Sequence, residues 1–489
     1  MKKKAQAIMF VGTGSNVGKS IFTAGLCRIL MRKGIRVSPF KAQNMALNSY
    51  VTSEGDEIGR AQAYQAYTAG LKPDVRMNPV LMKPSADNLS QIIVMGKPSG
   101  NYQALPYYNL KSKLKKIIRN AYDSLAAEYD VVVIEGAGSP AEINLYKHDM
   151  VNMSMAEYAA ADVFLIGDID KGGVFASLKG TIDLLSAKHK KLIKGIIINK
   201  FRGDINLLTP AFKMFRKYYK IPFIGTVPYN MDLRVEEEDS LVSAYYKSKF
   251  NSKTAEINIG IIRLPHISNF TDFDAFEYEK DSRCVFFNEP SMLKNFDCVI
   301  IPGTKATAAD FEYLKNSGLA SGLKKFAVEK DKLLVGICGG FQMLGKKIID
   351  KNKIESDTIE KKLLGFLNIS TELVSEKILK QVITEIKFLN KKYMISGYEV
   401  HNGNSIVDPD EIFIHKENIL GTYVHGIFDN DEFRRAFLNL IRNKKKLKPI
   451  RQITVLNEIK EKNMNNLADF IEKNIDVNYI LNLINIAKI

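Results

Sequence analysis

The chain has 489 residues and carries 70 Lys and Arg against 54 Asp and Glu, a formal net charge of +16. A hydrophobic fraction of 46% and a charged fraction of 25% are ordinary for folded globular proteins, and they exclude a disordered, collagenous or fibrous chain. At roughly 150 residues per domain, this length predicts two to four domains. No apolar run reaches the roughly 18 residues of a membrane-spanning helix. The short N-terminal apolar stretch runs into a glycine loop, unlike a signal peptide.

The cysteines and the basic residues indicate a reducing compartment and anionic small substrates. The four cysteines form no CxxC pair, so we expect no disulfide framework and a cytoplasmic protein. The basic stretches Lys188–Lys194, Lys346–Lys353 and Arg442–Arg451 are scattered and lack interleaved aromatic residues. They are typical of solvated lysine faces, so we expect no nucleic-acid partner and no membrane span.

The first half of the chain alternates short apolar strands with helical patterns. Continuous apolar, β-branched strands separated by helices predict an α/β fold with a parallel sheet that is covered on both faces. The predicted strands are Ala7–Val11, Val37–Phe40, Val131–Ile134, Val163–Ile166, Gly195–Ile198 and Phe223–Val227.

A charged segment without periodicity divides the chain. We place a linker at 234–254, between a first domain at 1–233 and a second domain at 255–489. The α/β pattern restarts in the second domain, with predicted strands at Ile257–Leu264, Val299–Pro302 and Leu333–Cys338. The last forty or so residues have helical spacing, as in Leu467 and Ile471, and we expect this tail to pack on the second domain.

A phosphate-binding loop follows the first strand and opens the first helix. It reads Gly-Thr-Gly-Ser-Asn-Val-Gly-Lys-Ser from Gly12 to Ser20, with Thr13 where glycine is usual. In such a loop backbone N–H groups surround phosphate oxygens, the lysine reaches the outer phosphates, and the serine can bind Mg²⁺. The order of strand, loop and helix predicts an ATP site formed by Gly12, Thr13, Gly14, Val17, Gly18, Lys19 and Ser20.

Three further strand ends carry polar side chains. Glu135 ends an apolar strand at the position of a second Mg²⁺ ligand, beside Ser20. Asp168 and Asp170 follow another strand, where a metal role and a loop or capping role are equally supported. Asn199 ends a further strand with an amide suited to reading a purine edge.

A second chemical signal lies at Cys338, in a strand, a G-x-C-x-G turn and a helix. This arrangement is typical of a nucleophile elbow, in which the N–H of the next residue, Gly339, helps to form an oxyanion hole. The helix N-terminus favours the thiolate. His425 ends a strand-like segment after the nucleophile and is the predicted base, and His401 is a second candidate.

Several long motifs extend around and between these sites. They are Phe40–Ser49, Gly59–Gln62, Val75–Leu81, Glu135–Asn144, Asp168–Phe175, Asn199–Asp204 and Arg263–Asp272. Together with the phosphate loop and the cysteine turn, they resemble the glutamine-hydrolysing cobyric acid synthases of cobalamin biosynthesis over nearly the whole chain.

The resemblance implies a dethiobiotin-synthetase-like first domain and a class I glutamine amidotransferase second domain. It implies ATP- and Mg²⁺-dependent amidation of the b, d, e and g carboxylates of adenosylcobyrinic acid a,c-diamide with glutamine nitrogen. The family's nucleophile and histidine correspond to Cys338 and His425, and Gly303 joins Gly339 in the oxyanion hole. Candidate corrinoid-binding residues are Gln43, Asn44, Asn48 and Asp149. The partners implied are the corrinoid polycarboxylate, glutamine and ATP.

The position that carries an orienting glutamate in most amidotransferases of this class is Ile427 here. We therefore predict a Cys–His dyad whose imidazole is held by a backbone carbonyl. The acids nearest in sequence, Asp429, Asp431 and Glu432, are expected to be solvated or to cap a helix.

Two alternatives remain. A cobyrinic acid a,c-diamide synthase would share the fold and the chemistry, although the stretches Gln43–Asn48 and Val75–Leu81 argue against it. A partition-type P-loop ATPase would share the phosphate loop but has no use for the thiol nucleophile at Cys338.

Overall fold

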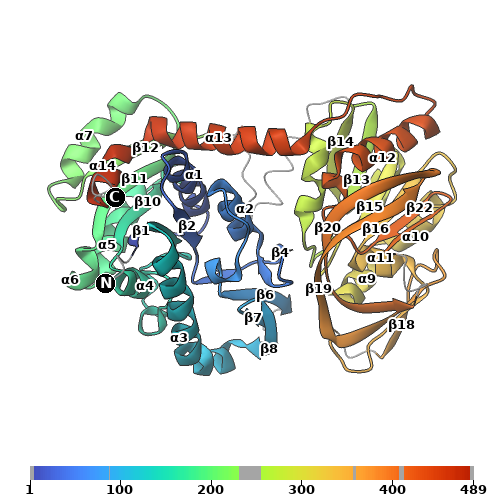
Figure 1. Cartoon of the computed structure of the whole chain (residues 1–489), viewed down its shortest axis with the longest axis horizontal. Helices are drawn as coiled ribbons and strands as arrows, with labels where there is room; N and C mark the ends of the chain where they lie inside the picture. Colours follow the sequence, from blue (N-terminus) through green and yellow to red (C-terminus); the bar gives the residue numbers. More distant parts are fainter. Residues whose placement is uncertain (1–4, 87–88, 231–254, 356–358, 407–411, 485–489) are drawn as a thin grey trace.

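The computed structural model describes residues 5–86, 89–230, 255–355, 359–406 and 412–484. They form an N-terminal lobe (5–230) and a C-terminal lobe (255–455), joined along one side by a long helix (Figure 1). The predicted linker at 234–254 lies outside the described residues, so the domain limits remain predictions. No helix in the described part of the chain is long and apolar enough to cross a membrane.

The N-terminal lobe is built on a six-stranded parallel sheet in the order β12-β11-β10-β1-β9-β2. Its strands are β1 Gln6–Gly12, β2 Val37–Phe40, β9 Val131–Glu135, β10 Asp162–Asp168, β11 Ile193–Phe201 and β12 Phe223–Pro228. Its helices are α1 Lys19–Arg32, α2 Arg60–Thr68, α3 Ala104–Glu128, α4 Met153–Ala159, α5 Val174–Leu184, α6 Ala187–Lys190 and α7 Ile205–Phe215. Separate apolar cores cover the two sheet faces, which confirms the predicted α/β class. Because the strands are parallel, their carboxyl ends share one edge, where ligands bind in such sheets.

A small extension of this lobe, antiparallel except for the pair β3–β6, was not predicted. It comprises a sheet in the order β3-β6-β7-β8 and a hairpin, β4-β5. The strands are β3 Gln43–Met45, β4 Ser49–Val51, β5 Glu57–Gly59, β6 Val80–Ala86, β7 Leu89–Val94 and β8 Lys97–Gln103. Strand β4 packs against the other lobe, so this extension forms part of the surface between the lobes (Figure 1).

The C-terminal lobe has its own six-stranded sheet in the order β14-β13-β15-β16-β22-β21, parallel except for β21. Its strands are β13 Ile257–Ile262, β14 Ser282–Phe287, β15 Cys298–Ile301, β16 Leu333–Ile337, β21 Phe413–Lys416 and β22 Ile419–Thr422. Its helices are α9 Thr307–Asn316, α10 Leu319–Phe326, α11 Gly339–Leu344 and α12 Asp431–Lys444. The strands predicted in this part of the chain are present.

A long hairpin covers the side of the C-terminal lobe that faces the other lobe (Figure 1). Its strands are β19 Ser370–Phe388 and β20 Lys391–Ile406, and β17 Lys347–Ile349 and β18 Glu360–Lys362 complete the sheet. Tyr398 of β20 donates a hydrogen bond to the Ser49 carbonyl of β4, at 3.0 Å. The hairpin therefore contacts the N-terminal lobe directly.

The C-terminal tail forms α13 Leu456–Asn474 and α14 Val477–Leu483. The prediction that it packs on the second domain holds only for the first turns of α13, where Leu456 joins the core of the C-terminal lobe and Lys460 pairs with Asp429. The rest of α13 lies along α1 of the N-terminal lobe. Its apolar face, including Leu467 and Ile471, is buried in one core with Phe22 and Leu26. A methyl group on Gly25 would lie 2.7 Å from Ile471 Cγ1, so the glycine permits this close approach. The apolar outer face of α1 needs a cover, and the tail supplies it.

Candidate functional site

The phosphate loop connects the end of β1 to the start of α1, as predicted. Asn16 and Gly18 adopt left-handed φ values of 61° and 105°, which curl the backbone before the helix. Gly12 is required because a Cβ there would lie 2.4 Å from Val17 Cγ2. Lys19 donates to the carbonyls of Gly14 (2.9 Å) and Gly138 (3.1 Å), so its ammonium lies over the loop. This is the geometry that an incoming phosphate requires.

Glu135 at the end of β9 is the polar centre beside the loop. The Ser20 hydroxyl donates to Glu135 Oε1 at 2.9 Å, and the Lys41 ammonium lies 2.9 Å from the same oxygen. Burial raises the pKa of Glu135, but Lys41 and a hydrogen bond from Gln65 outweigh this, and the pKa is lowered. The carboxylate therefore stays ionised next to a hydroxyl, the oxygen donor set that suits Mg²⁺ together with phosphate and water. These residues fit the ion.

The other predicted strand-end residues have different contacts. Asp168 pairs with Lys200 at 2.9 Å and accepts a hydrogen bond from the Asp170 amide. Asn199 donates to the Val17 carbonyl at 2.8 Å and thus fixes the phosphate loop to β11. Lys200 also donates to the Asn16 carbonyl, at 2.7 Å. Lys200 was not among the predicted site residues, and its contacts join the loop to Asp168.

The four candidate corrinoid residues are held in internal contacts. Asn44 donates to Gln62 at 2.8 Å, and Gln43 donates to the sulfur of Met82. Asn48 accepts from the Phe270 amide of the C-terminal lobe at 3.2 Å. Asp149 accepts three backbone N–H groups at the start of α4. The contacts thus give Asp149 a helix-capping role and Asn48 a role between the lobes.

Cys338 sits on the sharp turn between β16 and α11. Its φ of 51° and ψ of −109° are strained for a non-glycine residue, and such strain is typical of a nucleophile elbow. The flanking glycines have no room for a side chain. A Cβ on Gly336 would lie 2.6 Å from the Gly340 carbonyl oxygen, and one on Gly340 would lie 1.9 Å from that of Ile301. The small residues of the motif therefore let the turn approach the loop after β15.

His425 and Asp272 complete a triad with Cys338, and the predicted dyad is wrong in this respect. Asp272 Oδ2 lies 2.7 Å from His425 Nδ1, and Asp272 Oδ1 accepts the Gly426 amide at 2.9 Å. Burial alone lowers the pKa of His425, but the Asp272 carboxylate and the neighbouring Cys338 raise it to about 10. The imidazole is therefore protonated at neutral pH, paired with Asp272 on one side and placed to protonate a leaving group on the other.

The other candidate residues take different roles. His401 is held by Glu399 (3.0 Å) and by the Gly403 carbonyl, on the face of Tyr423. Asp429 pairs with Lys460, and Asp431 pairs with Arg434, so both acids form ion pairs where a solvated or capping role was expected. Gly303 lies beside the triad, since a Cβ there would be 3.0 Å from His425 Cε1. Its place and that of Gly339, at the start of α11, fit the two predicted oxyanion donors.

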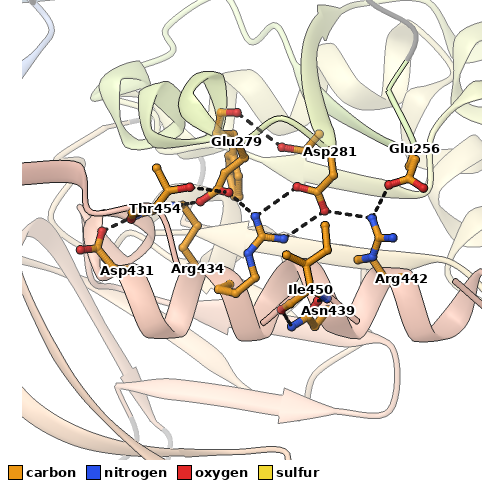
Figure 2. A network of polar contacts seen from close by, with 12 residues as sticks. Glu256, Glu279, Asp281, Asp431, Arg434, Asn439, Arg442, Ile450 and Thr454 are labelled. Carbon is orange, nitrogen blue, oxygen red and sulfur yellow. Dashed lines mark hydrogen bonds and ion pairs between the residues drawn. The ribbon is translucent and has the colours of Figure 1, made fainter. Parts of the chain in front are cut away.

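A buried ionic network holds the segment that carries Asp272 (Figure 2). Asp272 belongs to the 3₁₀ segment η4, Phe270–Tyr278, and the acids Glu279 and Asp281 follow it. Arg434 of α12 donates to Glu279 at 2.7 Å, and Arg435 and Arg442 pair with Asp281 at 3.0 and 3.1 Å. Helix α12 starts six residues after His425, so the network fixes η4 relative to the histidine.

Comparisons with known proteins find a matching family for each lobe. The family described as the CobQ/CobB/MinD/ParA nucleotide binding domain matches residues 8–242, and the CobB/CobQ-like glutamine amidotransferase domain matches residues 258–433. The chain is 44% identical to a cobyric acid synthase of Clostridium botulinum strain 657, over 98% of this chain and 99% of that protein. It is also 44% identical to the cobyric acid synthase of Carboxydothermus hydrogenoformans, over 99% of this chain and 100% of that protein. A match to a solved glutamine amidotransferase is 13% identical, covers 38% of this chain and 98% of that chain, and has a TM-score of 0.29.

Proposed function

Because the chain belongs to the cobyric acid synthase family, we propose that it amidates the b, d, e and g carboxylates of adenosylcobyrinic acid a,c-diamide. The enzyme is a glutamine amidotransferase-type ligase that carries out ATP-dependent amidation in cobalamin biosynthesis. One observation supports both halves of this reaction: a phosphate loop with Lys19 and Glu135 occurs in the same chain as a Cys338–His425–Asp272 triad. A partition-type ATPase would not need the triad. We place the reaction in the cytoplasm, because the four cysteines are free.

In the proposed glutaminase half, the Cys338 thiolate attacks the side-chain carboxamide of glutamine. The N–H groups of Gly339 and Gly303 bind the oxyanion, and protonated His425 gives its proton to the departing ammonia. The resulting thioester is hydrolysed by water, with neutral His425 as the base, and glutamate leaves. Asp272 holds Nδ1–H throughout, so Nε2 always faces the reacting atoms.

In the proposed synthetase half, a corrinoid carboxylate attacks the γ-phosphate of ATP and forms an acyl phosphate while ADP leaves. Ammonia then attacks the acyl carbon, and inorganic phosphate leaves as the amide forms. A carboxylate and ammonia only form a salt at neutral pH, so this activation is required. Lys19 stabilises the charge on the transferred phosphoryl group, and the loop N–H groups hold the nucleotide. Ser20 and Glu135 would hold Mg²⁺, which neutralises phosphate charge when bound.

The proposal is tested by incubating the protein with adenosylcobyrinic acid a,c-diamide, ATP, Mg²⁺ and glutamine, and counting the added amides by mass spectrometry. Four amides are expected, and none should form without ATP. An unchanged a,c-diamide, with cobyrinic acid converted to the diamide instead, would replace this function by that of the a,c-diamide synthase.

A further inference from the structure

The cavity beside Cys338 is walled by both lobes. Lys83 of β6, in the N-terminal lobe, lines it together with Lys305, Glu355 and Lys377 of the C-terminal lobe. The lobes are fixed to each other at this point: the Ser49 amide donates to Asn269 Oδ1 at 3.1 Å, and Asn269 lines the same cavity. The site of the nucleophile is therefore not built from the amidotransferase lobe alone.

Glu57 of the N-terminal lobe is shared between two of these lysines. The Lys83 ammonium donates to Glu57 Oε1 and to Ser49 Oγ, both at 2.9 Å, and Lys377 contacts Glu57 Oε2. Burial alone raises the pKa of Glu57, but Lys377 and Lys83 outweigh it and lower the pKa well below its usual range. Glu57 is thus a fully ionised carboxylate that is already bound by two cations.

Lys305 gives the cavity an excess of positive charge. Among the residues that the structure describes, its ammonium forms no hydrogen bond and no ion pair, and burial lowers its pKa. The remaining acid, Glu355, accepts the Thr307 amide at 2.8 Å, and burial raises its pKa to about 7. Three lysines thus lie beside one ionised and one weakly acidic carboxyl group, and burial lowers the pKa of one of them, Lys377, to about 7. Lys305 is only partly exposed and has no direct ion pair in the described part of the chain, with Glu355 and Glu57 acting on it from a distance, so its ammonium is available to an anionic ligand group.

We propose that Lys83 of the N-terminal lobe and Lys305 of the C-terminal lobe together bind the α-carboxylate of glutamine, while Glu355 receives its α-ammonium group. The inference rests on the proposed glutaminase function and deepens it. The ligand is an α-amino acid zwitterion whose side-chain carboxamide reaches Cys338. The cavity measures about 30 Å³, room for about one water, so side chains of its lining must move before glutamine can bind. Glu57 keeps Lys377 as its partner when Lys83 turns to the ligand.

The experiment compares two substrates, glutamine and 4-aminobutanamide, which is glutamine without the α-carboxylate. Ammonia release is measured for the wild type, for Lys305→Met and for Lys83→Met. Loss of a charge-assisted hydrogen bond typically weakens binding by about ten- to a hundredfold. We expect kcat/KM for glutamine to fall by that factor, mainly through KM, and kcat/KM for 4-aminobutanamide to change by less than about threefold. The preference for glutamine should therefore largely disappear.

Two matched variants serve as controls. Lys97→Met removes an exposed lysine of the same small sheet, paired with Asp56, and should leave both substrates unaffected. Lys83→Arg keeps the charge and should retain the preference. Synthesis from free ammonia shows whether each variant is folded. Replacing Lys305 breaks no ion pair among the described residues, so Lys305→Met still tests the inference if Lys83→Met is unstable. The inference is overturned if a lysine-to-methionine variant loses kcat/KM equally for both substrates, or if it keeps the full preference for glutamine. A wild type that hydrolyses neither substrate overturns the proposed function instead.

Discussion

Replacing Asp272 by asparagine tests the triad most directly. In the structure Asp272 accepts both the Gly426 amide and His425 Nδ1–H. If the introduced asparagine kept the Gly426 contact through its side-chain oxygen, its NH₂ group would face Nδ1. The ring would then carry its proton on Nε2, where it could not accept the thiol proton.

The size of the effect follows from the histidine. A pKa of about 10 instead of 6.5 corresponds to about 5 kcal/mol in favour of the protonated ring, which is what Asp272 and Cys338 contribute after the opposing effect of burial. If Asp272 contributes half of it, the loss of charge alone costs about a hundredfold in turnover. The wrong tautomer adds to this, and removing the orienting carboxylate of a triad can cost about 10⁴. We therefore expect a loss of between about 10³ and 10⁴.

The assay is ammonia release from glutamine, measured beside amide synthesis from added ammonium chloride, which should remain near the wild-type rate.

The pH profile gives a second readout. The imidazolium is the proton donor, so glutaminase activity falls as pH rises through the pKa of His425. Asp272→Asn lowers that pKa and should move the alkaline limb to lower pH. The control Asp429→Asn removes a partly exposed partner of Lys460 and should cost less than about tenfold. A similarly small loss for Asp272→Asn would refute the triad.

Four further outcomes are expected. Cys338→Ala should abolish glutamine-dependent synthesis and keep synthesis from ammonia at raised pH, and loss of both in a folded protein would contradict the separation of the two sites. Lys19→Ala should reduce synthesis at least about a hundredfold with either nitrogen source, measured as amides formed; near-normal turnover would exclude its phosphate role. Arg434→Met should destabilise the C-terminal lobe by about 3–5 kcal/mol, because it leaves buried Glu279 short of a partner, and chemical denaturation measures this. Ile471→Ala should cost about 2–5 kcal/mol in the N-terminal lobe, and a change confined to the C-terminal lobe would argue against the observed packing.

The parts of the fold and site that are local in sequence could be predicted. The strands of both large sheets are continuous apolar runs, and the phosphate loop and the cysteine turn each lie within ten residues. Asp272 could not be found in this way, because 153 positions separate it from His425. It lies in the motif Arg263–Asp272, which carried the resemblance, but nothing local in that motif identifies a partner.

The partner of an amphipathic helix is also invisible in its sequence. The spacing of Leu467 and Ile471 predicts an apolar face correctly, but it does not say which surface that face covers. Strands β19 and β20 were also not predicted, because polar residues interrupt the alternation of apolar and polar side chains along them. Parts of both strands are exposed, which explains these polar residues. The length and pairing of these two strands depend on contacts with each other and with the other lobe, and the sequence of one strand does not reveal those contacts.

The packing of α13 on α1 has a consequence for the way this protein is made. A ribosome releases α1 early, but the helix that covers its apolar face is translated more than 400 residues later. At roughly 5–20 residues per second, the interval is roughly 20 to 85 s. During this time Phe22 and Leu26 lack the cover that Leu467 and Ile471 later provide. The N-terminal lobe therefore reaches its final stability only after the C-terminal lobe has emerged, and the nascent chain should be a target for chaperones that bind exposed apolar helices.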